Sequence, residues 1–148
     1  MAVKLTQKEA DMLIEMLKKT AEKEIAFPQE RGRVEFDVFG DRREDIFVVN
    51  ISRKGINADG ASYQGRLRHR EGILMRLDVN PTGVHRNPDE EVIRGTHLHI
   101  YTEEYGMAVA IPFDTENKDL VGLCYAFFKH FHIIEPPAVT FQLKLEGI

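Results

Sequence analysis

The sequence predicts an α+β fold, with residues 1–148 forming a single domain around a largely antiparallel, curved sheet of about seven strands. Three observations predict it. A capping box at Thr6 and Glu9 opens a stretch of helical periodicity, alternating apolar runs separated by short turns follow, and a second helical stripe comes near the C-terminus. Short turns between consecutive strands favour antiparallel pairing, because parallel strands need long crossovers.

Each predicted helix has one apolar face that can pack on the sheet. After Thr6, apolar residues recur at steps of three and four, and Pro28 and Gly32 close the segment. The members of this stripe are Ala10, Leu13, Ile14, Leu17 and Ala21. The second helix follows Asn117, a candidate N-cap, and Pro136 ends it. Its stripe consists of Leu120, Cys124, Phe127, Phe128 and Phe131.

Seven segments alternate in hydrophobicity or are continuously apolar, as strands do. They are residues 33–40, 46–52, 63–69, 73–79, 97–101, 107–113 and 138–145. Between the fourth and fifth lies a polar excursion, residues 80–94, with Pro81 and Pro88. We expect this excursion to be irregular, and long loops of this kind often carry function.

Composition limits the protein classes that the chain can represent. A net charge of −4 over 148 residues argues against a generally basic nucleic-acid coat, although a local basic patch remains open. The single cysteine, Cys124, excludes an intramolecular disulfide and suits a reducing cytosol. The N-terminal stretch has no unbroken apolar run, so we expect no signal peptide, no membrane association and a cytoplasmic location.

Strand alternation gathers polar, reactive side chains on one face of the predicted sheet. In the segment GTHLHIY, Leu98 and Ile100 point to the core, and their neighbours therefore point away from it. Neighbouring strands in register would add arginines and an acid to this face. We expect its members to be Arg66, Arg68, Arg76, Asp78, His97, His99 and Tyr101.

The leading interpretation of this face is a site for RNA or another phosphate-bearing ligand. Metal-independent cleavage of RNA needs a base, an acid and a cation, which His97, His99 and Arg76 can supply without any cofactor. In this interpretation Tyr101 and His85 assist the chemistry. Arg66, Arg68 and Asp78 would contact the phosphate or a partner.

Other interpretations use the same residues, and the sequence does not decide whether the protein is an enzyme. His97 and His99 can bind a metal ion, with His85 or Glu103 as a further ligand. Alternatively, the face binds a protein, as in a phage-encoded inhibitor of a host defence protein or an antitoxin-like module. Exposed strand edges would also permit a homodimer. Finally, a solvated face of an antiparallel sheet is normally polar without having any function.

Residues 75–101 carry a pattern that resembles the signature of an uncharacterised family of small bacterial and phage proteins. The pattern reads Arg-x-Asp, His-x-Asn-Pro-Asp and Gly-x-His-x-His-x-Tyr, and here begins at Arg76, His85 and Gly95. The order of Arg-x-Asp, Pro, His and His-x-His is also similar to that of TumE-type toxins of bacterial toxin–antitoxin modules. These resemblances imply a mobile-element or defence-related setting, with a ribonuclease-like toxin as one outcome.

Overall fold

The main sheet is open, antiparallel and six-stranded in the computed structural model, which describes residues 4–53, 60–115 and 119–141. The strand order is β2-β3-β4-β5-β8-β9, so most strands lie beside their neighbours in sequence. The bounds are Arg33–Phe39 (β2), Ile46–Arg53 (β3), Ala61–Leu67 (β4), Ile73–Val79 (β5), His97–Ile100 (β8) and Ala110–Pro112 (β9). The predicted α+β class is therefore confirmed.

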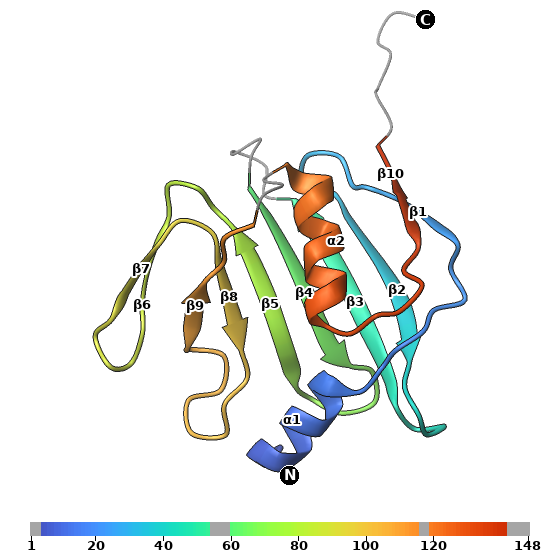
Figure 1. The fold of residues 1–148 in the computed structure, drawn as a ribbon, viewed down its shortest axis with the longest axis horizontal. Coiled ribbons are helices and arrows are strands. Elements are labelled where there is room, and N and C mark those ends of the chain that lie inside the picture. The colour runs from blue at the N-terminus through green and yellow to red at the C-terminus, as the bar shows by residue number, and fades with distance from the viewer. Residues whose placement is uncertain (1–3, 54–59, 116–118, 142–148) are drawn as a thin grey trace, which may run out of the picture.

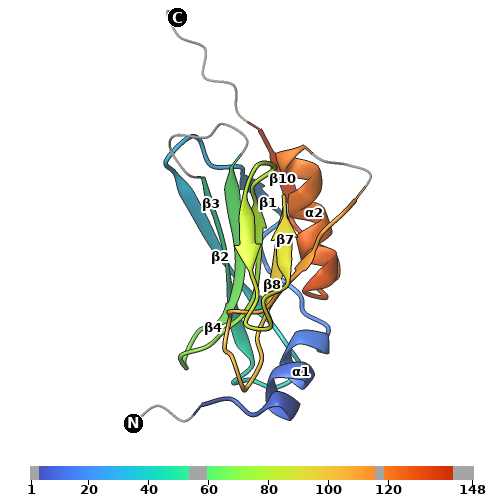
Figure 2. The same ribbon diagram turned by 90° about the vertical axis from the view of Figure 1, so that its left-hand side faces the viewer.

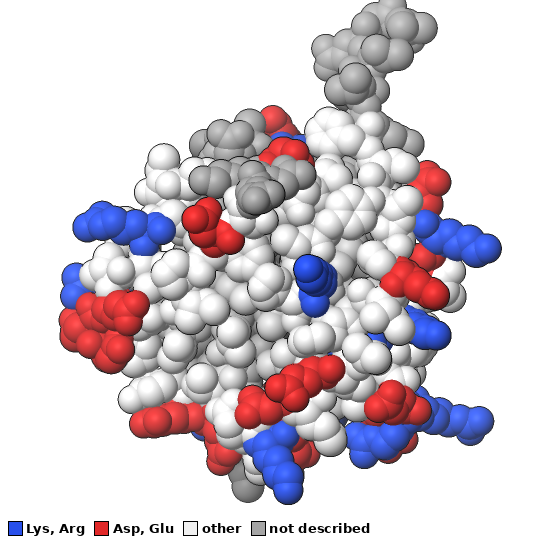
Figure 3. Space-filling view, viewed as in Figure 1, with Lys and Arg blue, Asp and Glu red and all other residues white. Residues whose placement is uncertain are grey.

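Both helices pack on the same side of this sheet, as the two views in Figures 1 and 2 show. Helix α1 spans Gln7–Glu15 and begins with the predicted capping box at Thr6. Helix α2 spans Leu120–His130 and lies across β4 and β5. On the face that carries α2, charged side chains lie mainly around the rim (Figure 3). In the described part of the chain, neither helix has the length and apolarity needed to cross a bilayer.

The core forms where the aromatic stripe of α2 meets the sheet. Phe131 packs against β4 at Gly65, where a Cβ atom would lie 2.6 Å from the Phe131 ring, so a larger residue would force the ring to shift. Tyr63 is fully buried, and its hydroxyl donates to the carbonyl oxygen of Leu120 at 2.6 Å. These contacts fix α2 on one face and leave the other face of the sheet for polar residues.

The first helix is shorter than its periodicity predicts. It ends at Glu15, and Leu17 is 57% exposed although it belongs to the predicted apolar stripe. The buried Lys18 explains this end, because its ammonium group donates to three carbonyl oxygens at 2.9 Å, those of Ile14, Met16 and Phe131. An interaction of this kind has no signature in hydrophobic periodicity.

Two further segments differ from the sequence-based prediction. The last predicted strand lies outside the main sheet: β10 (Ala138–Thr140) pairs in parallel with β1 (Glu24–Ala26) instead. Residues 80–94 are also more ordered than expected, because β6 (Val84–Arg86) and β7 (Val92–Arg94) form a hairpin. The N-cap of α2 is Asp119, while the predicted cap, Asn117, lies outside the described residues.

Candidate metal centre

The polar face lies opposite the helices, and cross-strand register brings its residues together. His97 on β8 pairs with Asp78 on β5, and His99 pairs with Arg76. On the next strand, Gln64 of β4 pairs with Arg76, and Arg66 lies two residues further along the same face. Arg68 follows β4 and donates to Asp37 on β2 at 2.8 Å. The register therefore brings together Arg76, Asp78, His97 and His99, whereas Arg66 and Arg68 lie on the same face but further away, on the side of β4 and β2.

The β6–β7 hairpin brings a third imidazole to the two histidines of β8. The ring of His85 on β6 stacks on that of His97, with centroids 5.3 Å apart and an interplanar angle of 18°. It meets the ring of His99 edge-on at 4.7 Å. The three rings thus form one cluster, called the histidine cluster below, from two strands, β6 and β8, between which β7 lies in the sequence.

Each imidazole of the histidine cluster is oriented by a backbone carbonyl. Nδ1 of His97 lies 2.8 Å from the oxygen of Gly95, and Nδ1 of His99 lies 2.7 Å from that of Met107. His85 uses its other nitrogen, with Nε2 placed 2.8 Å from the oxygen of Ala108. A carbonyl oxygen only accepts hydrogen bonds, so each of these nitrogens carries the hydrogen. In the neutral rings the lone pairs therefore lie on Nε2 of His97 and His99 and on Nδ1 of His85.

One ring nitrogen from each of the three histidines lies within 4.8 Å of the other two. Metal-binding histidines commonly donate their second ring N–H to a carbonyl or carboxylate, which fixes the tautomer and the ring orientation. All three imidazoles of the cluster have such a partner. The arrangement therefore has both the ligand atoms and the supporting hydrogen bonds of a three-histidine metal site.

Asp78 adds a negative charge beside the imidazoles. Its Oδ2 lies 3.5 Å from Nε2 of His97 and 3.3 Å from Nε2 of His99. Arg76 donates to both of its oxygens, at 2.8 and 3.0 Å, and Ser62 donates to Oδ1 at 3.1 Å. Burial alone would raise the pKa of Asp78, but its interactions with His97, His99 and Arg76 hold it well below the usual range. Asp78 in turn raises the pKa of His97.

The histidine cluster lies outside the hydrophobic core but has little contact with solvent. Only 6% of His97 and 3% of His99 are exposed, because the β6–β7 hairpin covers them. A solvated sheet face would leave both rings accessible. His97 and His99 are therefore not part of an ordinary solvated sheet surface.

Two predicted site residues lie elsewhere. Alternation predicts Tyr101 beside the histidines, but it follows β8 and turns into the core, where its hydroxyl donates to the carbonyl oxygen of Leu5 at 2.7 Å. Glu103, a candidate metal ligand, instead accepts a hydrogen bond from the backbone N–H of Gln7 at 2.7 Å. Strand alternation fails at Tyr101 because β8 ends at Ile100. Both residues anchor the N-terminal segment to the sheet.

Sequence reasoning assigned no role to two residues that support the cluster. Asn87 is buried and forms two hydrogen bonds with the backbone of Ala110, which tie the hairpin down. Gly95 adopts a φ of +82°, which non-glycine residues rarely adopt, and its carbonyl orients His97. Their positions in the sequence patterns His-x-Asn and Gly-x-His, next to the histidines that they position, are the feature of the sequence that could have identified them.

Comparison with known proteins places the chain in a family. A model of a family of unknown function, DUF6978, matches residues 5–133. The chain belongs to DUF6978. The matched part of this DUF6978 member includes the whole histidine cluster, Arg76 and Asp78, which agrees with the expectation of an uncharacterised family. Neither curated proteins nor solved structures gave a significant match.

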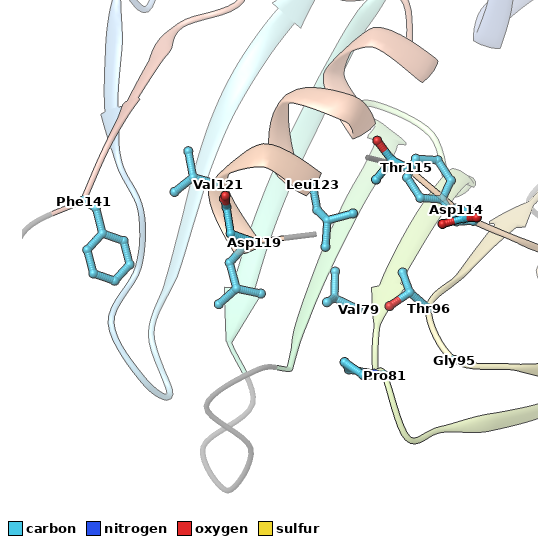
Figure 4. A pocket seen from close by; sticks show the side chains of 12 residues that line it. Val79, Pro81, Gly95, Thr96, Asp114, Thr115, Asp119, Val121, Leu123 and Phe141 are labelled. Carbon is cyan, nitrogen blue, oxygen red and sulfur yellow. The ribbon is translucent and has the colours of Figure 1, made fainter. Parts of the chain in front are cut away.

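The DUF6978 chain also has a pocket that is separate from the cluster. It has a volume of about 610 Å³ and lies at the N-terminal end of α2, where Leu123, Val79 and Thr96 surround it (Figure 4). Its lining is largely apolar, with Asp114 and Asp119 as the charged members, and contains no histidine. The cluster is therefore the part of the described structure in which ligand atoms for a metal converge.

Proposed function

We propose that this DUF6978 member is a metal-dependent enzyme that binds a divalent transition-metal ion through His85, His97 and His99. The observation that carries the proposal is the convergence of three imidazole nitrogens within 4.8 Å of one another. A hydrogen bond from one nitrogen of each ring to a backbone carbonyl supports it, because it leaves the other nitrogen with a lone pair for an ion. Imidazole suits zinc, copper, iron and nickel.

The dimensions of the cluster suit such an ion after a small adjustment. Zinc–nitrogen bonds of about 2.1 Å in a tetrahedral site place the ligand nitrogens about 3.4 Å apart. The nitrogens of the histidine cluster lie within 4.8 Å of one another, so ring rotations that bring them up to about 1.4 Å closer would close the site. Three protein ligands also leave a position for water or substrate, which is the arrangement of catalytic rather than structural zinc sites.

The remaining residues of the centre suit hydrolytic chemistry. An ion of this kind lowers the pKa of a bound water and polarises the substrate. Asp78 lies beside two imidazole nitrogens of the cluster, where its carboxylate would orient a water held by the ion by accepting a hydrogen bond from it. Arg76 holds Asp78 with two hydrogen bonds and adds positive charge near the developing anion. We therefore propose a hydrolase.

The burial of the imidazoles supports a metal ion over direct contact with a large substrate. His97 and His99 are only 6% and 3% exposed, so a substrate cannot contact the rings themselves without displacing the hairpin, whereas it can bind to an ion that the rings hold. Nε2 of His97 and Nε2 of His99 also lie 3.5 and 3.3 Å from Oδ2 of Asp78. The carboxylate would attract a cation held at these nitrogens.

Metal content and cobalt spectroscopy test the proposal. Protein loaded with zinc or cobalt and then dialysed should retain about one ion per chain, and bound Co²⁺ should give the intense visible absorption of a tetrahedral site. A panel of p-nitrophenyl carboxylate, phosphomonoester and phosphodiester substrates then measures hydrolysis with and without a chelator. We expect hydrolysis that depends on the metal.

Matched variants separate ligand loss from unfolding. His85→Gln removes a ligand on the hairpin and spares the two buried rings, and it should lower metal affinity by about 10- to 100-fold or more. His69→Gln is the control, because His69 is exposed and lies outside the cluster. Equal metal binding by the wild type, His85→Gln and His97→Gln would refute the site.

A second candidate function is metal-free cleavage of a phosphodiester such as RNA. It is supported by the contact of Asp78 with both His97 and His99, because the hydrogen bond to Asp78 raises the pKa of His97 and thereby favours its acid form. The similarity of the Arg76, Asp78, His97 and His99 pattern to TumE-type toxins supports the same candidate. Cleavage that continues in the presence of a chelator would favour it over the metal-dependent enzyme.

A further inference from the structure

A shallow groove lies beside the histidine cluster, between the β4–β5 turn and the segment that follows β8. Its volume is about 690 Å³. One wall carries three arginines and a histidine with one acid, and the other includes Tyr101 and Met107; the first set is Arg66, Arg68, His69, Arg70 and Glu71. We call it the basic groove. Its charge is local, since the whole chain has a net charge of −4.

The basic groove adjoins the proposed metal centre. The carbonyl oxygen of Met107, a lining residue, orients the ring of His99. On the sheet, Arg76 pairs with both His99 and Gln64, and Arg66 lies two residues from Gln64 on the same face. Strands β4 and β8 are two strand spacings apart, or about 10 Å. A ligand in the groove can therefore extend to the centre.

The arginines of the groove can exchange their present partners for an anion. In the described part of the chain, no carboxylate lies within ion-pair distance of Arg66, whose Nη1 has only a 3.4 Å contact with the Leu67 carbonyl. Arg68 and Arg70 pair with Asp37 and Glu9, but all four side chains are 37–46% exposed. Exposed pairs are weak and compete poorly with a multiply charged ligand, and guanidinium groups match phosphate oxygens well.

The number of guanidinium groups in the basic groove suits more than one phosphate. Three arginines line it, Arg66, Arg68 and Arg70, and each can bind phosphate oxygens. Tyr105 precedes Gly106, another lining residue, and is 49% exposed. Exposed aromatic rings beside a basic track are typical of sites for single-stranded nucleic acid, where bases stack on them.

We propose that the basic groove binds the phosphate backbone of single-stranded nucleic acid and thereby presents a phosphodiester to the histidine cluster. The evidence for binding is the charge and position of the basic groove. The role of the phosphodiester as a substrate rests, in addition, on the proposed metal-dependent function. The inference thus names the substrate class of that centre.

Fluorescence anisotropy tests the binding, with labelled uridine RNA and thymidine DNA strands of about 12 nucleotides, a length within the usual site size. The protein is used as purified, zinc-loaded and zinc-stripped. Arg66→Glu should weaken binding by about tenfold or more, as expected for loss of a charge-assisted hydrogen bond. It should also reduce the slope of log affinity against log salt by about 0.7 for each phosphate that the variant no longer neutralises. Arg33→Glu, the same charge change on an exposed residue of β2 outside the groove, should leave affinity within about twofold.

The outcomes separate the groove from the metal centre. Tight metal binding without nucleic-acid binding, or binding that Arg66→Glu leaves unchanged, would overturn the groove and leave the metal centre standing. Groove-dependent binding by a protein that takes up no metal would support the groove and refute the metal-dependent enzyme. If inorganic phosphate binds as tightly as either strand, the ligand is a small phosphate compound and the nucleic-acid proposal is wrong. Preference between the RNA and DNA strands identifies the source of the phosphodiester.

Discussion

The side-chain amide of Asn87 pairs with the backbone of Ala110: its Nδ2 donates to the carbonyl oxygen, and its Oδ1 accepts from the N–H, both at 2.8 Å. Two residues earlier, His85 contacts the carbonyl oxygen of Ala108 at the same distance. The hairpin is thus docked on the sheet edge at alternate residues. This docking places the imidazole of His85 over those of His97 and His99. The cluster therefore has three rings only while the hairpin is held in place.

Replacing Asn87 with alanine should loosen the hairpin and weaken metal binding. The substitution leaves the N–H and carbonyl of Ala110 without their partners, and each unpaired buried group costs about 1–3 kcal/mol. We expect a loss of about 2–4 kcal/mol in the free energy of unfolding, measured by denaturant titration. Metal affinity, measured by chelator competition on the folded variant, should fall by about tenfold or more because His85 is no longer held.

Asn50→Ala is the matched control for that experiment. Asn50 lies on β3, and its amide donates to the exposed carboxylate of Glu35 at 2.8 Å. Its loss removes an asparagine hydrogen bond without touching the hairpin, so stability should change by less than about 1 kcal/mol and metal affinity should not change. If Asn50→Ala and Asn87→Ala lower metal affinity equally, the hairpin does not position a ligand.

Gly95→Ala should disturb His97 through the backbone. Gly95 has a φ of +82°, and a non-glycine residue held there costs about 1–3 kcal/mol. Relief of that strain would move the carbonyl that orients His97, so metal affinity should decrease together with stability. Gly72→Ala is the control for strain, since Gly72 has a φ of +152° in the β4–β5 turn. If both variants keep wild-type metal affinity, the Gly95 carbonyl has no positioning role.

Much of the fold follows from short-range patterns that the sequence displays. Alternation over residues 33–39 and 73–79 and a continuous apolar run over 46–52 predicted strands, and β2, β5 and β3 form there. The same alternation predicted that His97 and His99 share a face with Arg76 and Asp78, because register in adjacent antiparallel strands preserves faces. Local periodicity therefore located two of the three imidazoles and their acid.

The remaining parts depend on long-range partners that periodicity does not encode. The coverage of His97 and His99 arises from hydrogen bonds between the hairpin and residues more than 20 positions away, at Ala108 and Ala110. Tyr101 leaves the polar face because its hydroxyl finds the carbonyl of Leu5, 96 residues away. Polar contacts between distant segments therefore determine both the coverage of the two histidines and the position of Tyr101. Such contacts leave no trace in the pattern of apolar residues.

Gly65→Val should destabilise the protein without affecting the metal centre directly. A Cβ atom at Gly65 would lie 2.6 Å from the Phe131 ring, so α2 must shift or the ring must leave its place. Overpacking of a filled core costs about 1–3 kcal/mol, occasionally more. Combining it with Phe131→Leu, which frees space at this point, should recover part of the loss in thermal or denaturant unfolding. An unchanged loss in the double variant would mean that contact with Phe131 is not the cause.

Lys18 should make stability depend on pH above neutrality. Burial lowers the pKa of Lys18 from 10.5 to about 7 in the folded protein. Between these values the unfolded chain holds the proton that the folded protein has released, so the unfolded state binds more protons and the free energy of unfolding rises with pH. In Lys18→Met this contribution is absent. The stability of the wild type relative to the variant should therefore be lowest below pH 7 and rise by up to about 1.4 kcal/mol per pH unit above it.

Denaturant unfolding of the wild type and Lys18→Met at several pH values between about 6 and 9 measures this difference, and all other titrating groups largely cancel. The hydrogen bonds of Lys18 oppose the effect of burial on its pKa. Three carbonyl oxygens at 2.9 Å accept from the three N–H groups of the ammonium ion, whereas a neutral amine has only two N–H groups. If these hydrogen bonds outweigh desolvation, Lys18 keeps its proton and the stability difference stays constant across the range. A constant difference would thus show that the carbonyl cage at the end of α1 binds an ammonium ion throughout.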